Sequence, residues 1–325
     1  MTSRTLTLSN GAGSIPTVGL GTWTVFGELG SDEQVEAAAC AAIDAGYRHI
    51  DCAWNYGTQK GIGRGLETKI KEGVIKREDM FITSKLWDTH HNPVLVMEEL
   101  KDTLKQLRTE YIDMFLIHWP TALKDQDFSG DVIAPKNDDG SIAWACYPLE
   151  DVWKEMEACV KAGLAKNIGI SNFNKKQSER IFNSSTIKPS NMQIEVSPYF
   201  SNSRLIEYCK EKGMVVTAYA PLGAPLRPWR EAGEPSAFED KVLLDIAKSK
   251  GRSVAQIVIR YHLQTGIVVI PKSITPSRIQ ENINVYDFEL SGDEMKQIKG
   301  LDRNLRVYKE PITIGHQEYP FDDPY

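Results

Sequence analysis

The stretch MFITSKLWDTHHNPVLVMEELKDTLKQLRTEYIDMFLIHW (80–119) decides the fold class of this chain. Two short apolar runs, 80–86 and 111–119, flank a segment at 92–107 whose apolar residues recur at helical spacing. Strands that are joined by a helix of this length pair in parallel, because the helix carries the chain back to the edge where the first strand began. The stretch therefore predicts a strand–helix–strand unit.

The same unit recurs almost to the end of the chain. Eight strand-like runs occur, at 17–23, 47–53, 80–86, 111–119, 166–172, 192–198, 214–222 and 267–273. The segments between them are amphipathic, and several begin with Ser, Asp or Asn and end in Gly, as helices do. An open doubly wound sheet usually has fewer strands and a glycine-rich nucleotide loop after the first. Eight units in one pass therefore predict an α/β fold, a single-domain (β/α)8 TIM barrel over residues 1–325.

Several segments depart from this alternation. TLTLSNGAGSIPTV (5–18) consists of two short runs around Asn10-Gly11, which predicts an N-terminal β-hairpin that covers the floor of the barrel. Residues 121–148, 223–238 and the tail after 303 are too long for ordinary connections. Loops longer than ~12–15 residues in a compact domain are usually functional, so we expect these at the C-terminal face, where barrels carry their active sites.

The composition is that of an ordinary globular protein, with 41% hydrophobic and 25% charged residues. The 38 Lys and Arg residues against 44 Asp and Glu give a net charge of −6, which offers no basic surface to nucleic acid or an anionic membrane. The N-terminus lacks the apolar core of a signal peptide, and no apolar run approaches the ~18 residues of a membrane-spanning helix. We expect a cytoplasmic monomer that binds small molecules, with its five cysteines reduced and mostly buried.

Ionisable residues close three consecutive strands of the predicted barrel. Asp51 ends the second strand, Lys85 the third and His118 the fourth, and Tyr56 follows shortly after Asp51. The C-terminal ends of barrel strands meet at one face, so we expect these four side chains to form one group. Asp51 and Lys85 should pair, and the cation should lower the pKa of the Tyr56 phenol, which makes Tyr56 a candidate general acid.

A phosphate site is predicted near the C-terminus rather than after the first strand. No G-x-G-x-x-G pattern follows a strand, which disfavours a Rossmann site. The eighth strand instead ends in Lys272 and Ser273, and a helix begins at Thr275 with Arg278 in its first turn. Helix N-termini flanked by cations bind phosphate readily. A solvated helix face would explain Arg278 and Asn282 equally well.

Together the motifs resemble the aldo-keto reductase superfamily, most closely its aldose reductase and aldehyde reductase branch. The resemblance rests on these stretches, in the same order: VGLGTW (18–23), AIDAGYRHIDCAWNYG (42–57), FITSKLW (81–87), DMFLIHWP (113–120), IGISNFN (168–174), QIEVSPY (193–199), YAPLG (219–223), IPKSITPSRIQEN (270–282) and YPFDD (319–323). It implies the TIM barrel already predicted, NADPH/NADP⁺ as the cofactor and no metal. It also implies a catalytic group formed by Asp51, Tyr56, Lys85 and His118.

The resemblance further assigns residues to the cofactor and the substrate. Those implied to surround NADPH are Thr22, Trp23, Ser171, Asn172, Gln193, Tyr219, Ala220, Leu222, Lys272, Ser273, Thr275, Arg278, Glu281 and Asn282. Within this set, Ser171, Asn172 and Gln193 would bind the nicotinamide carboxamide. Tyr219 would stack on the ring, and residues 272–282 would hold the adenosine 2′-phosphate and the adenine. Those implied to wall the substrate site are Trp23, Trp87, Trp119, Trp229 and Tyr308.

The implied reaction is the reduction of aldehydes, and also of ketones or sugars, to alcohols with Tyr56 as general acid. The chain departs from the branch at several loop positions. After the tyrosine, GTQK (57–60) replaces an Asn-Glu pair. The branch also closes an acidic residue of the loop after YAPLG over the cofactor, paired with a basic residue after GTW, but Leu226 and Thr24 stand at these positions. We therefore expect the loop to close through Trp229 and backbone contacts and to release NADP⁺ readily.

Other functions fit parts of the sequence. A metal-dependent barrel hydrolase would need a ligand cluster, but adjacent residues of an extended chain point apart, so we place His90 and His91 in a surface loop. A non-catalytic NADPH-binding member of the family would not need all four ionisable positions. A ketone, steroid or dihydrodiol oxidoreductase of the same family would differ chiefly in the long loops, and this alternative stays open.

Overall fold

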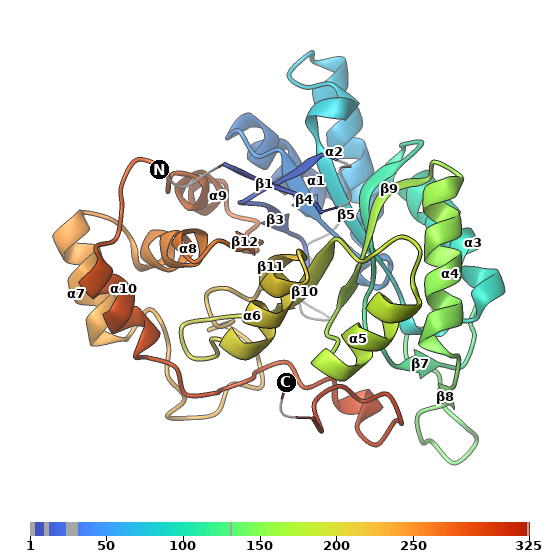
Figure 1. Ribbon diagram of the computed structural model, residues 1–325. Helices are drawn as coiled ribbons and strands as arrows, with labels where there is room; N and C mark the ends of the chain where they lie inside the picture. The colour runs from blue at the N-terminus through green and yellow to red at the C-terminus, as the bar shows by residue number, and fades with distance from the viewer. Residues whose placement is uncertain (1–3, 10–12, 24–31, 131, 324) are drawn as a thin grey trace.

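Eight parallel strands form the centre of the molecule (Figure 1). The computed structural model describes residues 4–9, 13–23, 32–130, 132–323 and 325. The central strands are β3 (Leu20–Gly21), β4 (His49–Asp51), β5 (Phe81–Leu86), β6 (Ile112–Ile117), β9 (Ala165–Ser171), β10 (Asn191–Glu195), β11 (Val215–Tyr219) and β12 (Val268–Val269). Neighbouring strands are hydrogen-bonded in the order β12-β11-β10-β9-β6-β5-β4-β3. Each of the eight predicted strands is present.

The barrel closes between its first and last strands. Parallel bridges join Val18 to Val269 and Gly21 to Lys272. Gly21 permits this approach, since a Cβ atom added there would lie only 2.5 Å from the carbonyl oxygen of Ile270. The predicted TIM barrel is thus confirmed.

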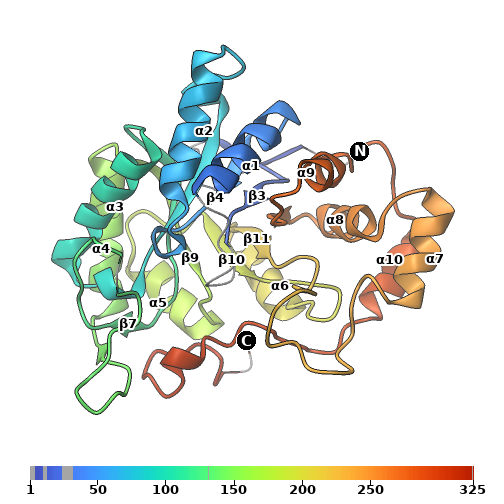
Figure 2. The ribbon, with the colours of Figure 1, turned by 180° about the vertical axis from the view of Figure 1, so that it is seen from behind.

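The helices form a layer around the strands, as Figures 1 and 2 show from opposite sides. They are α1 (Asp32–Asp44), α2 (Gln59–Lys71), α3 (Pro93–Leu107), α4 (Leu149–Lys161), α5 (Lys175–Ser184), α6 (Ser203–Glu211), α7 (Lys241–Lys250), α8 (Val254–Gln264), α9 (Pro276–Ile283) and α10 (Gly292–Lys299). Short 3-10 turns lie at η1 (Trp54–Tyr56), η2 (Arg77–Asp79), η3 (Asp88–His90) and η4 (Pro311–Thr313). None of the helices in the described part of the chain is long and apolar enough to cross a membrane.

Several helices begin and end at the residues that local chemistry favours. Asn174 and Ser253 begin α5 and α8 with reciprocal hydrogen bonds to the residue three positions later. Gly251 ends α7 in the left-handed region, with a φ of 60°. These boundaries keep each helix short enough to return the chain to the next strand.

The N-terminal hairpin lies at the N-terminal end of the barrel. Its strands β1 (Thr5–Thr7) and β2 (Ser14–Pro16) pair antiparallel, while the Asn10-Gly11 turn lies outside the described residues. Leu8 and Ile15 of the hairpin pack against Phe81 and Val268, the first residues of β5 and β12. The hairpin therefore covers the barrel floor as predicted, and it leaves the strand C-termini for the site.

The long loops are more ordered than the sequence indicates. The 121–148 loop contains an antiparallel ribbon of β7 (Ala122–Leu123) and β8 (Trp144–Ala145). After α10 the chain runs past β10 and α5 toward this ribbon, as the red segment of Figure 1 shows. The five cysteines are free; Cys52, Cys159 and Cys209 are buried, and Cys146 is exposed.

Candidate active site

The four predicted ionisable residues meet at the C-terminal ends of β4, β5 and β6. Lys85 lies at the centre, fully buried, and donates hydrogen bonds to Asp51 Oδ1 at 2.6 Å, the Cys52 carbonyl oxygen at 2.8 Å and Tyr56 OH at 3.4 Å. His118 Nε2 lies 3.5 Å from Tyr56 OH. We call Asp51, Tyr56, Lys85 and His118 the strand-end cluster.

The Tyr56 phenol stays protonated in this setting. Burial raises its pKa well above the usual range, and the negative charge of Asp51 raises it further. The expectation that Lys85 lowers this pKa is wrong, because the ammonium is paired at 2.6 Å with Asp51, which offsets its charge. At neutral pH Tyr56 therefore carries a proton that it can donate.

The His118 imidazole stays neutral. Burial lowers its pKa well below the usual range, and the Lys85 ammonium lowers it further. Its Nδ1 atom is buried and meets no hydrogen-bond partner among the described residues. With Nε2 facing the phenol, His118 can donate a hydrogen bond from that nitrogen to a ligand oxygen.

A second layer of polar side chains holds the cluster from β9, β10 and β11. Gln193 Nε2 donates to Asp51 Oδ2 at 2.7 Å, and Asn172 Nδ2 donates to the His118 carbonyl oxygen at 3.0 Å. Tyr219 OH donates to Asn172 Oδ1 at 2.7 Å. Ser171, Thr22, Ala220 and Leu222 lie at neighbouring strand ends or just beyond them, and Thr22 Oγ1 donates to the Asp51 carbonyl oxygen at 2.9 Å. The structure thus brings the residues predicted for the nicotinamide beside the cluster.

The predicted phosphate residues gather at the start of α9. Lys272, Thr275 and Arg278 are exposed, while Ser273 is buried and accepts a hydrogen bond from the Thr275 N–H at 3.1 Å. Asn282 is buried, so the alternative of a solvated face does not apply to it. Glu281 accepts a hydrogen bond from Ser253 at the start of α8.

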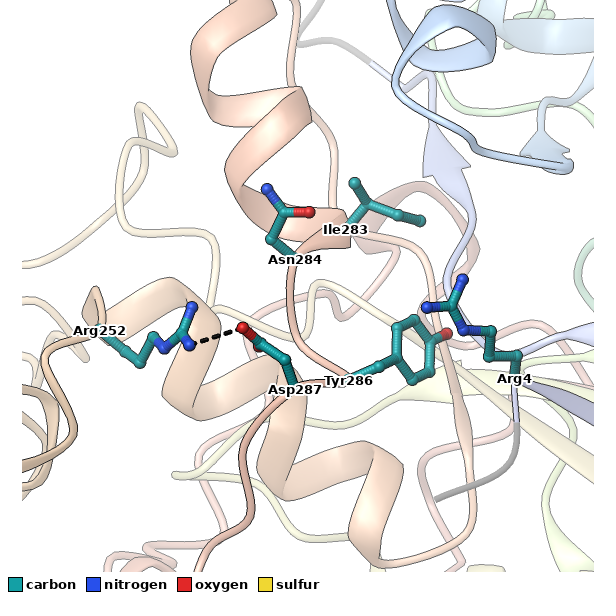
Figure 3. A pocket seen from close by; sticks show the side chains of 6 residues that line it. All are labelled: Arg4, Arg252, Ile283, Asn284, Tyr286 and Asp287. Carbon is teal, nitrogen blue, oxygen red and sulfur yellow. Dashed lines mark hydrogen bonds and ion pairs between the residues drawn. The ribbon is translucent and has the colours of Figure 1, made fainter. Parts of the chain in front are cut away.

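The other end of α9 forms a separate hollow. Figure 3 shows its lining, made of Arg4, Arg252, Ile283, Asn284, Tyr286 and Asp287. Arg252 Nη2 lies 2.7 Å from Asp287 Oδ2, and the Arg4 guanidinium lies over the Tyr286 ring. The arginines here already have partners, and the hollow is remote from the strand ends.

The predicted aromatic residues form two groups around the cluster. Trp87 and Trp119 are buried, with ring centroids 5.4 Å and 6.4 Å from the His118 ring. On the other side, the Tyr308 ring lies 5.6 Å from both Trp23 and Tyr219 and 5.7 Å from Trp229. Apolar walls on two sides suit an apolar ligand held over a polar centre.

Sequence reasoning missed two carboxylates of the site. Glu195 ends β10, at the same face of the barrel as the strand-end cluster, and it accepts hydrogen bonds from the backbone N–H groups of Val307 and Tyr308 at 2.9 Å each. A search of the predicted strand 192–198 for ionisable residues would have found Glu195. Glu310 lies in the C-terminal tail, where no periodicity marks it.

The prediction for the paired histidines was wrong. His90 and His91 are fully buried rather than part of a surface loop. Nδ1 of His90 lies 2.6 Å from Glu99 Oε2 in α3, which satisfies that ring nitrogen inside the fold. Among the residues that the structure describes, no group of three or more metal-ligating side chains occurs.

Comparisons with known proteins agree on one family. The aldo/keto reductase family model matches residues 17–303. Aldo-keto reductase family 1 member A1 of Homo sapiens is 43% identical over 321 residues, covering 96% of both sequences. Aldo-keto reductase family 1 member A1-A of Danio rerio is 43% identical over 331 residues, covering 99% of both. The solved aldose reductase of Schistosoma japonicum matches with a TM-score of 0.90 at 42% identity, covering 99% of this chain and 100% of that one.

The closed barrel and its strand-end cluster define the class of protein, a TIM-barrel oxidoreductase. The resemblance inferred from the motifs is confirmed by the comparisons. The chain belongs to the aldo/keto reductase family, whose members generally use NAD(P)H.

Proposed function

We propose that this enzyme reduces aldehydes to alcohols with NADPH and that Tyr56 donates the proton. The observation that carries the proposal is the place of the Tyr56 hydroxyl, 3.4 Å from Lys85 Nζ and 3.5 Å from His118 Nε2 at the strand ends. A carbonyl oxygen at this point would accept hydrogen bonds from Tyr56 OH and His118 Nε2–H. Donors aimed at an oxygen that gains negative charge stabilise the transition state.

The residues of the cluster divide the chemistry between them. NADPH held by these residues would supply the hydride for the carbonyl carbon of the aldehyde. Tyr56 gives its proton to the carbonyl oxygen, so the products are the alcohol and NADP⁺. Lys85 stabilises the phenolate that remains on Tyr56, and Asp51 holds Lys85 in place.

The start of α9 fits the 2′-phosphate of NADPH. Thr275 begins the helix without a capping side-chain hydrogen bond, so its side chain does not compete with an anion for the N–H groups that follow Pro276. The exposed cations Lys272 and Arg278 lie beside this helix start. We therefore propose NADPH rather than NADH as the preferred cofactor.

The nicotinamide end fits the layer of amides behind the cluster. Asn172 and Gln193 are buried and fixed by hydrogen bonds to the His118 carbonyl oxygen and to Asp51. Ser171 Oγ accepts a hydrogen bond from Asn172 Nδ2 at 3.2 Å. Side chains held in this way are preorganised to bind a carboxamide beside the reacting centre.

A panel of aldehydes, ketones, steroids and alcohols tests the function. Oxidation of NADPH is followed by its absorbance with each carbonyl compound, and reduction of NADP⁺ with each alcohol. Among uncharged compounds, we expect apolar and aromatic aldehydes to give the highest kcat/KM, because the two aromatic groups flank the centre. Turnover of ketones or steroids alone would contradict the proposal, as would a purified, NADPH-binding protein that reduces none of the compounds.

A further inference from the structure

A segment of the C-terminal tail crosses the strand-end cluster and is anchored on both sides. We call residues 306–313 the crossing segment. On one side, Glu195 accepts the N–H groups of Val307 and Tyr308, and the Tyr308 ring packs against Trp23 and Tyr219. On the other side, Ile312 packs against the buried aromatic cluster that contains Trp87 and Trp119. The Ile312 carbonyl oxygen accepts a hydrogen bond from Trp144 Nε1 at 3.0 Å.

Glu310 lies between these two anchors. Its backbone is in the left-handed region, with a φ of 45°, which is unfavourable for a residue with a side chain. It precedes the turn η4, but its side chain does not cap that turn. Within the described ranges, no cation and no hydrogen-bond donor contacts its carboxylate. Neither local capping nor an ion pair therefore accounts for an acid here.

Glu310 is half-buried, on the segment that crosses the strand-end cluster. Burial alone raises its pKa to about 7. Its negative charge in turn raises the pKa of Tyr56 and that of the buried Asp88. The negative charge of Glu310 therefore acts on Tyr56, the proposed proton donor.

The cations on the crossing segment and in the cluster are paired, stacked on aromatic rings or exposed. Lys85 is paired with Asp51, and the Arg306 guanidinium lies over the Phe200 and Phe321 rings at 4.5 Å and 3.6 Å. Lys309, the next residue, is exposed. A half-buried anion without a counter-ion has lost part of its hydration, and a bound cation offsets that cost.

We propose that Glu310 is a specificity-determining residue that favours aldehydes carrying a cationic group, such as an ammonium, and disfavours aldehydes that carry a carboxylate. The proposal rests on the proposed function, since it assumes that the carbonyl is reduced at Tyr56. The carbonyl oxygen then points to the cluster, and the rest of the substrate extends past the crossing segment. An opposite charge that passes a half-buried carboxylate is attracted, and a like charge is repelled.

An isosteric pair of aldehydes, one cationic and one neutral, tests this inference without a change of shape, and a carboxylate aldehyde tests the opposite charge. The probes are 4-(trimethylammonio)butanal, its neutral isostere 5,5-dimethylhexanal, and 4-oxobutanoate, with kcat/KM measured under saturating NADPH. The variants are Glu310→Gln, which removes the charge, and Glu310→Asp, which keeps it. Asp322→Asn is the matched control, because it removes one exposed negative charge from the same tail.

We expect Glu310→Gln to lower the ammonium-to-neutral ratio of kcat/KM by about five- to twentyfold and to raise the carboxylate-to-neutral ratio. Glu310→Asp should keep most of the preference, and Asp322→Asn should keep all of it. Equal ratios in the wild type and Glu310→Gln, with the neutral aldehyde still reduced, would overturn the inference alone. Failure of the wild type to reduce any of the three aldehydes would overturn the proposed function instead.

Discussion

The strand-end cluster and the crossing segment face each other but are built in opposite ways. The cluster stands on the ends of parallel strands and on the turn η1 next to them, and Lys85 at its centre has three hydrogen-bond partners. The crossing segment has no strand of its own. Aromatic contacts, two backbone N–H groups on Glu195 and the hydrogen bonds from Trp144 and Trp229 to its carbonyl groups hold it in place. A centre built on strand ends suits the chemical step, and a tail segment held by side chains of other elements suits the choice of substrate.

This difference also separates the energetic roles of the charges. Asp51 and Lys85 form a buried pair in which each charge is compensated, and removal of one partner of such a pair typically costs about 3–5 kcal/mol. Glu310 is compensated by nothing in the described part of the chain. We therefore expect the first pair to serve the fold and the reaction, and the single charge to serve a ligand.

The strongest test of the comparison is removal of the proton donor. Tyr56→Phe should lower kcat by at least ~10²-fold, the scale of general acid catalysis, and leave NADPH affinity nearly unchanged. Steady-state kinetics and a fluorescence titration with NADPH measure the two effects. Tyr208→Phe is the control, because the Tyr208 hydroxyl is also buried but lies in α6. A fully active Tyr56→Phe protein would remove Tyr56 from the chemistry.

The choice between NADPH and NADH should depend on the start of α9, not on the strand-end cluster or the crossing segment. A charge-assisted hydrogen bond is worth ~1.5–3 kcal/mol, so Arg278→Ala should weaken NADPH binding by roughly ten- to a hundredfold and NADH binding hardly at all. Dissociation constants for both cofactors give the answer. Arg252→Ala, which changes an arginine paired at the far end of the same helix, is the control. Equal losses for NADPH and NADH would mean that Arg278 is structural.

The charge preference should depend on pH. Burial raises the pKa of Glu310 to about 7, so its carboxylate is mostly protonated at pH 6 and mostly charged at pH 8. The ammonium-to-neutral ratio of kcat/KM should therefore rise severalfold between these values. The charge of Glu310 also raises the pKa values of Tyr56, Asp88 and Tyr319. The pH profile of the ratio is therefore measured for Glu310→Gln as well. The same rise in the variant would assign the titration to another group.

The smallest effect concerns the loop that meets the crossing segment. Leu226 is 83% exposed and Trp229 46%, while Trp229 Nε1 donates to the Val307 carbonyl oxygen at 3.2 Å. Thr24, the other end of the missing acid–base latch, lies outside the described residues. A loop without this charged latch should release NADP⁺ readily, so chemistry should limit kcat. A primary deuterium isotope effect on kcat above unity, with no pre-steady-state burst, is expected; a burst with a kcat insensitive to deuterium would contradict this.

The two regions also differ in how far the sequence predicts them. Asp51, Lys85 and His118 could be found because a strand end fixes where a side chain points, and Glu195 follows the same rule. Glu310 could not, because the path of an aperiodic tail depends on distant partners such as Glu195 and Trp144. The two wrong predictions, a surface position for His90 and a lowered pKa for Tyr56, have the same origin. Glu99 pairs with the buried His90, and Asp51 offsets the charge of Lys85 beside Tyr56. Each partner lies on another element, where sequence spacing does not show it.

A single-turnover experiment tests whether the strand-end cluster serves the chemical step and the crossing segment serves the choice of substrate. Each preformed enzyme–NADPH complex is mixed with excess 5,5-dimethylhexanal, and the first-order rate of NADPH oxidation is recorded for the wild type, Tyr56→Phe and Glu310→Gln. We predict that Tyr56→Phe is slower by at least ~10²-fold, while Glu310→Gln changes this rate far less than it changes the ammonium-to-neutral ratio. Losses of similar size in both variants would contradict the account, because the crossing segment would then take part in the chemical step itself.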